Sequence, residues 1–147
     1  MKAFKKILVP IDFSPPSLQA LEYATDLARR YEASLELVYV YQSIAYALPE
    51  GYVLVTPDQV TEILGEFEKQ MQRAKEQALA AGVAQVESAV VEGYPITEIL
   101  RRQQEHEHDA IVMGTHGRSG IKRVFLGSVA ENVLRSAKCP VLVVRGS

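Results

Sequence analysis

The chain has 147 residues, 48% of them hydrophobic and 23% charged, which is ordinary for a globular protein with one core. Its 16 basic and 18 acidic residues give a net charge of −2, which argues against charge-driven binding of nucleic acid. No run approaches the ~20 apolar residues that span a bilayer. The single cysteine, Cys139, cannot form an internal disulfide and is expected to be a small core residue. We therefore expect one cytoplasmic domain.

Short apolar runs alternate with helical patterns along the chain. The predicted strands are 7–11, 35–41, 83–91, 110–113 and 141–144. One predicted helix begins after Ser14, and three others cover 58–81, 95–105 and 128–137. Ser14 and Pro15 suit the N-cap and first position of a helix, and Gly82 suits a C-terminal cap. The alternation predicts an α/β fold, an open parallel five-stranded sheet with helices on both faces.

The segment 42–57, QSIAYALPEGYVLVTP, shows neither the apolar run of a strand nor the spacing of a helix. It contains two tyrosines and several aliphatic residues, so a bare solvated loop is not expected. We expect a loop that folds back onto the edge of the sheet. A lid over a ligand, a dimer contact and an extra edge strand are the alternatives.

The most informative segment is 113–133, MGTHGRSGIKRVFLGSVAENV. A glycine-rich turn follows a predicted strand, and the glycines of the spacing G-x2-G-x9-G-S let the backbone approach a ligand without a Cβ in the way. The N–H groups of such a loop and of the next helix suit phosphate, with Arg118 and Lys122 as counter-ions. Walker A and G-x-G-x-x-G motifs are absent, which argues against P-loop NTPases and ordinary dinucleotide dehydrogenases. The segment predicts a phosphate site, with a nucleotide as its occupant.

Asp12 follows the first predicted strand, whereas the glycine-rich segment follows the fourth. An aspartate before a helix that begins with proline often forms only an Asx turn. At the mouth of a strand, however, a carboxylate can bind ribose hydroxyls. Two strand orders are common for five strands, 2-1-3-4-5 and 3-2-1-4-5. Asp12 and the glycine segment share a crevice if strands 1 and 4 are neighbours, which selects 3-2-1-4-5.

Ser128 and Glu131 have the spacing of a capping box, so Ser128 is the predicted N-cap of the last helix. The N–H groups of Gly127, Ser128 and Val129 remain able to bind phosphate.

The three histidines give no sign of a metal site. His116 lies in the glycine-rich loop, where contact with phosphate and simple exposure to solvent are equally compatible with the sequence. His106 and His108 are two positions apart, and side chains with that spacing on a helix do not face each other. No third ligand with zinc spacing is visible, so we expect no bound metal.

The sequence resembles the universal stress protein family over essentially its whole length. The resemblance is carried by KKILVPIDFS at 5–14, VEGYP at 91–95, GTHGRSGIKRVFLGSVAENVL at 114–134 and CPVLVVR at 139–145. It implies a single Rossmann-like domain over residues 1–147 with strand order 3-2-1-4-5. The intact G-x2-G-x9-G-[ST] pattern is similar to the ATP-binding branch of the family, which implies ATP with Mg²⁺ held by its phosphates.

The same resemblance implies roles for individual residues. Asp12 would hold the ribose, main-chain groups of Val40 would face adenine, and Gly114 would pack under the ribose. The whole implied site consists of Pro10, Asp12, Val40, Met113, Gly114, His116, Gly117, Arg118, Gly127, Ser128 and Val129. The family also implies a homodimer joined through the last strand, 141–145, which would cover an apolar edge that is otherwise prone to aggregation.

These features predict an ATP-binding sensor or switch in the stress response, with a slow ATPase or phosphotransferase as the alternative. Phosphoryl transfer needs a group that orients the nucleophile, and the sequence shows no general base near the loop. Flavoprotein-like and pyrophosphatase-type adenine-binding domains are minor alternatives. The loop after the first strand reads DFSPPS, which lacks the SGG-x-D-S pattern of the pyrophosphatase type.

Overall fold

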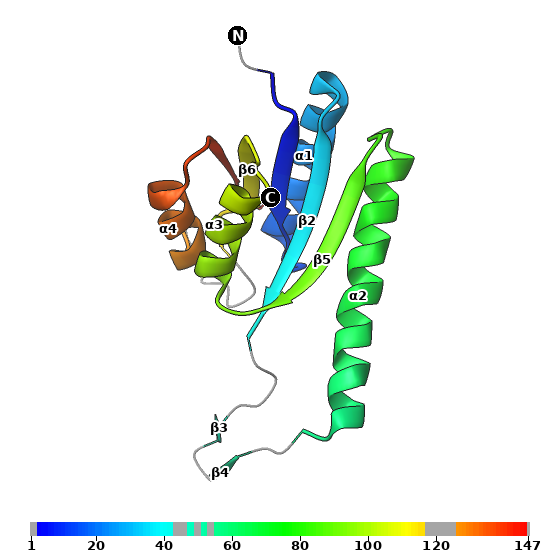
Figure 1. The fold of residues 1–147 in the computed structure, drawn as a ribbon, viewed down its shortest axis with the longest axis vertical. Coiled ribbons are helices and arrows are strands. Elements are labelled where there is room, and N and C mark those ends of the chain that lie inside the picture. The colour runs from blue at the N-terminus through cyan, green and yellow to red at the C-terminus, as the bar shows by residue number, and fades with distance from the viewer. Residues whose placement is uncertain (1–2, 43–46, 49–50, 53–54, 117–125, 147) are drawn as a thin grey trace.

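In the computed structural model, the described residues are 3–42, 47–48, 51–52, 55–116 and 126–146. Their elements are β1 (Lys6–Pro10), α1 (Pro15–Tyr31), β2 (Ser34–Tyr41), β3 (Ala47–Leu48), β4 (Gly51–Tyr52), α2 (Pro57–Ala80), β5 (Val86–Glu92), α3 (Pro95–Glu105), β6 (Ala110–Gly114), α4 (Ser128–Ser136) and β7 (Val141–Val144). One parallel sheet has the order β5-β2-β1-β6-β7 (Figure 1). Numbered along the chain, its strands follow 3-2-1-4-5, which confirms the predicted order and the α/β fold.

Each face of the sheet has its own apolar core, because successive side chains of a strand point to opposite faces. Leu37 of β2 belongs to the core under α1 and α2, together with Met71. Val38, the next residue, belongs to the core under α3 and α4, together with Ile99. Figure 1 shows α2 on one side of the sheet and α3 and α4 on the other. The prediction of helices on both faces is confirmed.

Local caps determine where the two long helices begin. Ser14 is the N-cap of α1, where its Oγ accepts a hydrogen bond from the Ser17 N–H at 3.4 Å. Thr56 and Gln59 form a capping box at the start of α2, which the sequence analysis did not identify. Gly82 follows the end of α2 with φ 107°, a conformation that glycine adopts without strain. The predicted caps of α1 and α2 are therefore confirmed.

Three expectations need correction in detail. β5 begins at Val86 rather than at residue 83, because Val83 lies in the turn after α2 and its N–H donates to the Ala78 carbonyl. Cys139 is partly buried and packs against the core under α3 and α4 instead of lying inside it. Within 42–57, β3 and β4 form an antiparallel pair that is separate from the main sheet (Figure 1). None of the described helices has the length and apolar character needed to cross a membrane.

Candidate functional site

The sequence-predicted site lies at the edge of the sheet where β1, β2 and β6 end. β1 and β6 are neighbours, and parallel strands end at the same edge. Asp12 follows β1 by two residues, and Gly114 is the last residue of β6. Val40 lies near the end of β2, two residues beyond the one paired with Pro10. Asp12, Val40 and Gly114 therefore share the carboxyl edge of the sheet, where ligands bind in open α/β folds.

Gly114 is in close contact with the first turn of α1. A Cβ on Gly114 would lie 2.8 Å from the Cβ of Pro16 and 2.8 Å from the backbone nitrogen of Ser17. Ser17 is tied to the end of β1, because its Oγ accepts a hydrogen bond from the Asp12 N–H at 3.3 Å. The absence of a side chain at Gly114 thus serves the packing of helix against strand. Met113, before it, is buried in the core under α3 and α4.

Asp12 forms the turn that the sequence suggested as its simplest role. Its Oδ1 accepts hydrogen bonds from the N–H of Ser14, at 3.0 Å, and from the Ser14 hydroxyl. This is an Asx turn, and it orients the residue that caps α1. A role for the same carboxylate in binding ribose remains a prediction.

The start of α4 is anchored to the end of β6. The Gly127 N–H donates to the Thr115 carbonyl at 2.6 Å, and the Thr115 N–H donates to the Val144 carbonyl at 2.9 Å. A Cβ on Gly127 would lie 2.9 Å from that Thr115 oxygen and 2.9 Å from the Cβ of His116. The His116 ring is close by, with its Nδ1 3.0 Å from Thr115 Oγ1. The amino end of α4 therefore lies at the same edge as Asp12.

The predicted capping box at Ser128 and Glu131 is wrong. The N-cap is Gly127, with φ −68° and ψ 161°, and no side chain caps the helix. Glu131 instead forms an ion pair with Arg135 at 2.9 Å. The bond from Gly127 to Thr115 fixes the turn one residue earlier, so Ser128 becomes the first helical residue and is exposed. Uncapped N–H groups of a first helical turn are donors that suit an anion.

Two predicted site residues, Gly117 and Arg118, lie outside the described residues, as do Lys122 and Arg123.

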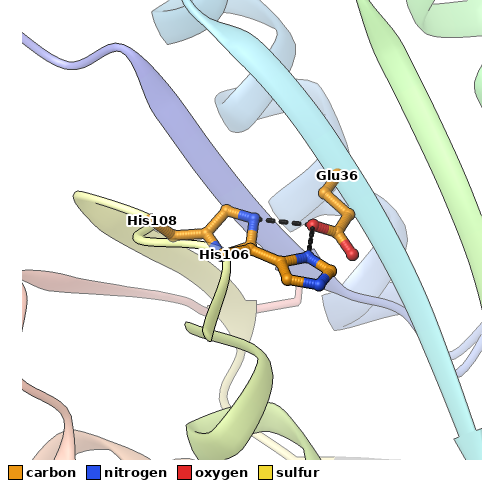
Figure 2. Close-up of side chains that lie close together, drawn as sticks. All are labelled: Glu36, His106 and His108. Atoms are coloured by element: carbon orange, nitrogen blue, oxygen red, sulfur yellow. Dashed lines mark hydrogen bonds and ion pairs between the residues drawn. The ribbon is translucent and has the colours of Figure 1, made fainter. Parts of the chain in front are cut away.

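A second polar cluster lies at the opposite, amino edge of the sheet. Glu36 comes from the start of β2, and His106 and His108 come from the turn between α3 and β6 (Figure 2). The Nδ1 of His106 and the Nε2 of His108 each lie 2.8 Å from the same oxygen, Oε2 of Glu36. The expectation that the two rings face apart on a helix is wrong, because α3 ends at Glu105. Glu107 then adopts a left-handed φ of 56°, and both rings meet at one carboxylate.

Glu36 is an ionised carboxylate at neutral pH. Burial alone would raise its pKa, but the close contacts that His108, His106 and Arg102 make with its oxygens outweigh burial and lower the pKa to about 2. Arg102, on α3, donates to Oε1. Glu36 is not among the site residues predicted from the sequence, although a charged residue inside the apolar run LELVYVY indicates that a partner faces this strand.

The open parallel sheet, its helices on both faces and the helix start at its carboxyl edge define a Rossmann-like α/β protein. The family model described as the universal stress protein family matches residues 3–145, and the chain belongs to that family.

Individual relatives agree with this assignment. The chain is 37% identical to universal stress protein MJ0531 of Methanocaldococcus jannaschii over 145 residues, which cover 97% of this chain and 82% of that protein. The solved structure of universal stress protein UspA from Lactobacillus plantarum superimposes with a TM-score of 0.82 and 27% identity, covering 99% of this chain and 100% of that one. A universal stress protein in complex with cAMP superimposes with a TM-score of 0.74 and 28% identity, covering 99% of this chain and 100% of that one.

Proposed function

We propose that this protein binds an adenine nucleotide, ATP, at the carboxyl edge of the sheet and acts as a nucleotide-dependent sensor or switch in the stress response. The observation that carries the proposal is the start of α4, which is bonded to the end of β6 and has no side-chain cap. Such a helix start offers N–H donors and the positive end of the helix dipole to phosphate. The relative solved with cAMP supports an adenine nucleotide as the ligand.

Different residues would bind the phosphates, the ribose and the adenine of the nucleotide. The Gly127 N–H already donates to Thr115, so the phosphate donors of this helix are the N–H groups of Ser128 and Val129. Asp12 would accept hydrogen bonds from the ribose, and main-chain groups of Val40 would face adenine. Gly117 and Arg118 would complete the phosphate site, and Mg²⁺ would be held by the phosphates.

The assembly proposed with this function is a homodimer joined along β7. β7 is an edge strand of the sheet, and its residue Leu142 is 42% exposed. An edge with unpaired backbone groups pairs readily with a second copy. In sedimentation equilibrium, the wild-type protein should be a dimer, and Leu142→Lys should shift it toward monomer. A wild-type monomer at all concentrations would contradict this assembly.

The nucleotide is tested by denaturing the purified protein and separating the released ligand by anion exchange. Ser128→Pro then tests the phosphate position by calorimetric titration with ATP. Proline fits the first helical position and the extended conformation of Gly127, so it removes one N–H donor and leaves the helix intact. Loss of a hydrogen bond to a charged group costs about 1.5–3 kcal/mol, so ATP affinity should fall roughly 10- to 160-fold. Ser128→Ala, which keeps the N–H, is the matched control and should bind like the wild type.

Each outcome has a distinct meaning. Intact ATP in the released material supports a switch that holds its nucleotide, whereas ADP or AMP supports the slow ATPase. Equal ATP affinity for Ser128→Pro and wild type would show that the start of α4 does not bind the phosphates. A protein that releases no nucleotide and does not bind added ATP would overturn the proposal.

A further inference from the structure

The cluster of Glu36, His106 and His108 lies away from the proposed nucleotide site. Glu36 is the third residue of β2, and His108 precedes β6 by two residues, so both lie at the amino edge of the sheet. Asp12 and Gly114 mark the carboxyl edge. We propose that Glu36, His106 and His108 form a binding site for Zn²⁺, independent of the nucleotide.

The arrangement of the three potential ligand atoms suits a small metal ion. One atom from each residue lies within 4.8 Å of the other two, and both rings point to Oε2 of Glu36 (Figure 2). Zinc bonds of about 2.0–2.1 Å place tetrahedral ligand atoms about 3.3 Å apart. The two separations of 2.8 Å between a histidine nitrogen and Oε2 of Glu36 therefore need to open by about 0.5 Å. The two histidine nitrogens, which lie within 4.8 Å of each other, must also be about 3.3 Å apart in the bound state.

The ligand types favour zinc over other common ions. Two imidazoles and one carboxylate form a set that Zn²⁺ accepts, with a fourth position left for water. Mg²⁺ and Ca²⁺ prefer oxygen ligands, and this cluster offers two nitrogens.

His108 is a buried imidazole whose ring nitrogens make no well-formed hydrogen bond within the part of the chain that the structure describes. The residue is 3% exposed, and among the described residues neither Nδ1 nor Nε2 has a partner in hydrogen-bonding geometry, although Nε2 is 2.8 Å from Oε2. The backbone is fixed, because the His108 N–H donates to the Gln103 carbonyl and Gln103 Nε2 donates to the His108 carbonyl. Buried polar atoms nearly always have a partner. A metal ion at Nε2 would supply one.

Arg102 orients the carboxylate for this role. Its guanidinium donates to Oε1 of Glu36, which leaves Oε2 facing the two rings. Hydrogen bonds of this kind orient the ligands of many metal sites.

The surroundings balance the charge and give access. Lys6 Nζ donates to the His106 carbonyl at 2.7 Å, which adds a positive charge nearby. Glu87, on β5, is paired in register with Glu36 and adds a negative charge. It lines a groove that Glu36 and the two histidines also line. The groove has a volume of about 510 Å³ and is lined by both histidines. The His106 side chain is 39% exposed, so an ion can enter from solvent.

The test is a zinc titration of untagged protein that has been treated with chelator and desalted. The wild type should bind one Zn²⁺ per chain by calorimetry, gain thermal stability with zinc, and give the visible spectrum of four-coordinate Co²⁺. His106→Gln, His108→Gln and Glu36→Gln should each lose affinity. The loss should exceed the about 10- to 100-fold seen when a group that only positions a ligand is removed.

Two variants control for binding elsewhere. His116→Gln removes the third histidine of the chain, and Cys139→Ser removes its thiol; both should bind zinc like the wild type. Circular dichroism establishes that each variant is folded. If His108→Gln fails to fold, the part-exposed His106 still decides the question. Wild-type affinity in His106→Gln, or no zinc binding by the wild type at millimolar Zn²⁺, overturns the site.

Discussion

Gly114, at the end of β6, lies directly against Pro16, in the first turn of α1. A Cβ on Gly114 would be 2.8 Å from the Cβ and the carbonyl carbon of Pro16. Backbone therefore meets backbone where the strand ends and the helix begins. This contact brings the end of β6 close to the turn around Asp12, and both belong to the proposed nucleotide site.

Gly114→Ala should destabilise the protein by about 1–3 kcal/mol, because neither α1 nor β6 can move away without disturbing the core. The matched control is Gly65→Ala on α2, where a Cβ would meet nothing within 4 Å. Alanine in an open helical position should stabilise by about 0.5–1 kcal/mol. Urea unfolding of both variants measures the difference. If Gly114→Ala is as stable as the wild type, the close packing is wrong.

Asp12→Asn and Asp12→Ala separate the turn from the binding of ribose. Asparagine retains an Oδ1 acceptor for the Ser14 N–H, so its free energy of unfolding should stay within about 0.5 kcal/mol of the wild type. Alanine loses that acceptor and should be less stable by about 0.5–2 kcal/mol. Both should weaken ATP binding by about 1–3 kcal/mol if the carboxylate holds the ribose. Unchanged ATP affinity in Asp12→Asn would show that Asp12 forms the turn and does not bind the ribose.

Arg102→Met should destabilise the metal-free protein by about 1–3 kcal/mol, because Glu36 loses its cationic partner while most of its side chain stays out of solvent. Arg30→Met is the control, since Arg30 and Asp26 form an exposed pair on α1. Exposed pairs of this kind contribute little to stability, so Arg30→Met should leave the free energy of unfolding nearly unchanged. Thermal unfolding in the presence of chelator compares the two. Equal small losses would show that the Glu36 pair contributes no more than a surface pair.

Cys139 should react slowly with alkylating agents below pH 9. Burial, and then the nearby charge of Asp109, raise the pKa of its thiol above the usual 9.0. The thiolate is the reactive form, so a raised pKa leaves less of it at any given pH below that value. The rate with iodoacetamide should therefore be lower than that of a free cysteine peptide at pH 8 and keep rising above pH 9. A rate that levels off below pH 9 would contradict the raised pKa.

Much of the fold could be predicted from the sequence because its signals are local. Ser14 before Pro15, and Gly82 after a long helical pattern, mark helix ends through contacts within a few residues. The apolar runs alternate with helices, and that order leaves few sheet topologies. The strand order followed from one functional argument, that Asp12 and the glycine-rich segment share an edge, and the structure has that order.

The start of α4 shows where a local signal was not enough. Ser128 and Glu131 match a capping box in sequence, yet the N-cap is Gly127. The deciding contact is the hydrogen bond from Gly127 to Thr115, which lies on the other side of the loop. A contact across a loop competes with a local cap, and sequence spacing alone does not rank the two.

The sequence by itself determined the order of the helices and of the strands in the main sheet, the start of α1, the end of α2, and the family to which the chain is similar. Only the tertiary structure decided that Glu36 and His106, which are 70 residues apart, meet at the amino edge of the sheet. The physical reason is that parallel pairing places the starts of β2 and β6 on either side of β1. The left-handed turn at Glu107 then directs both histidine rings toward the carboxylate.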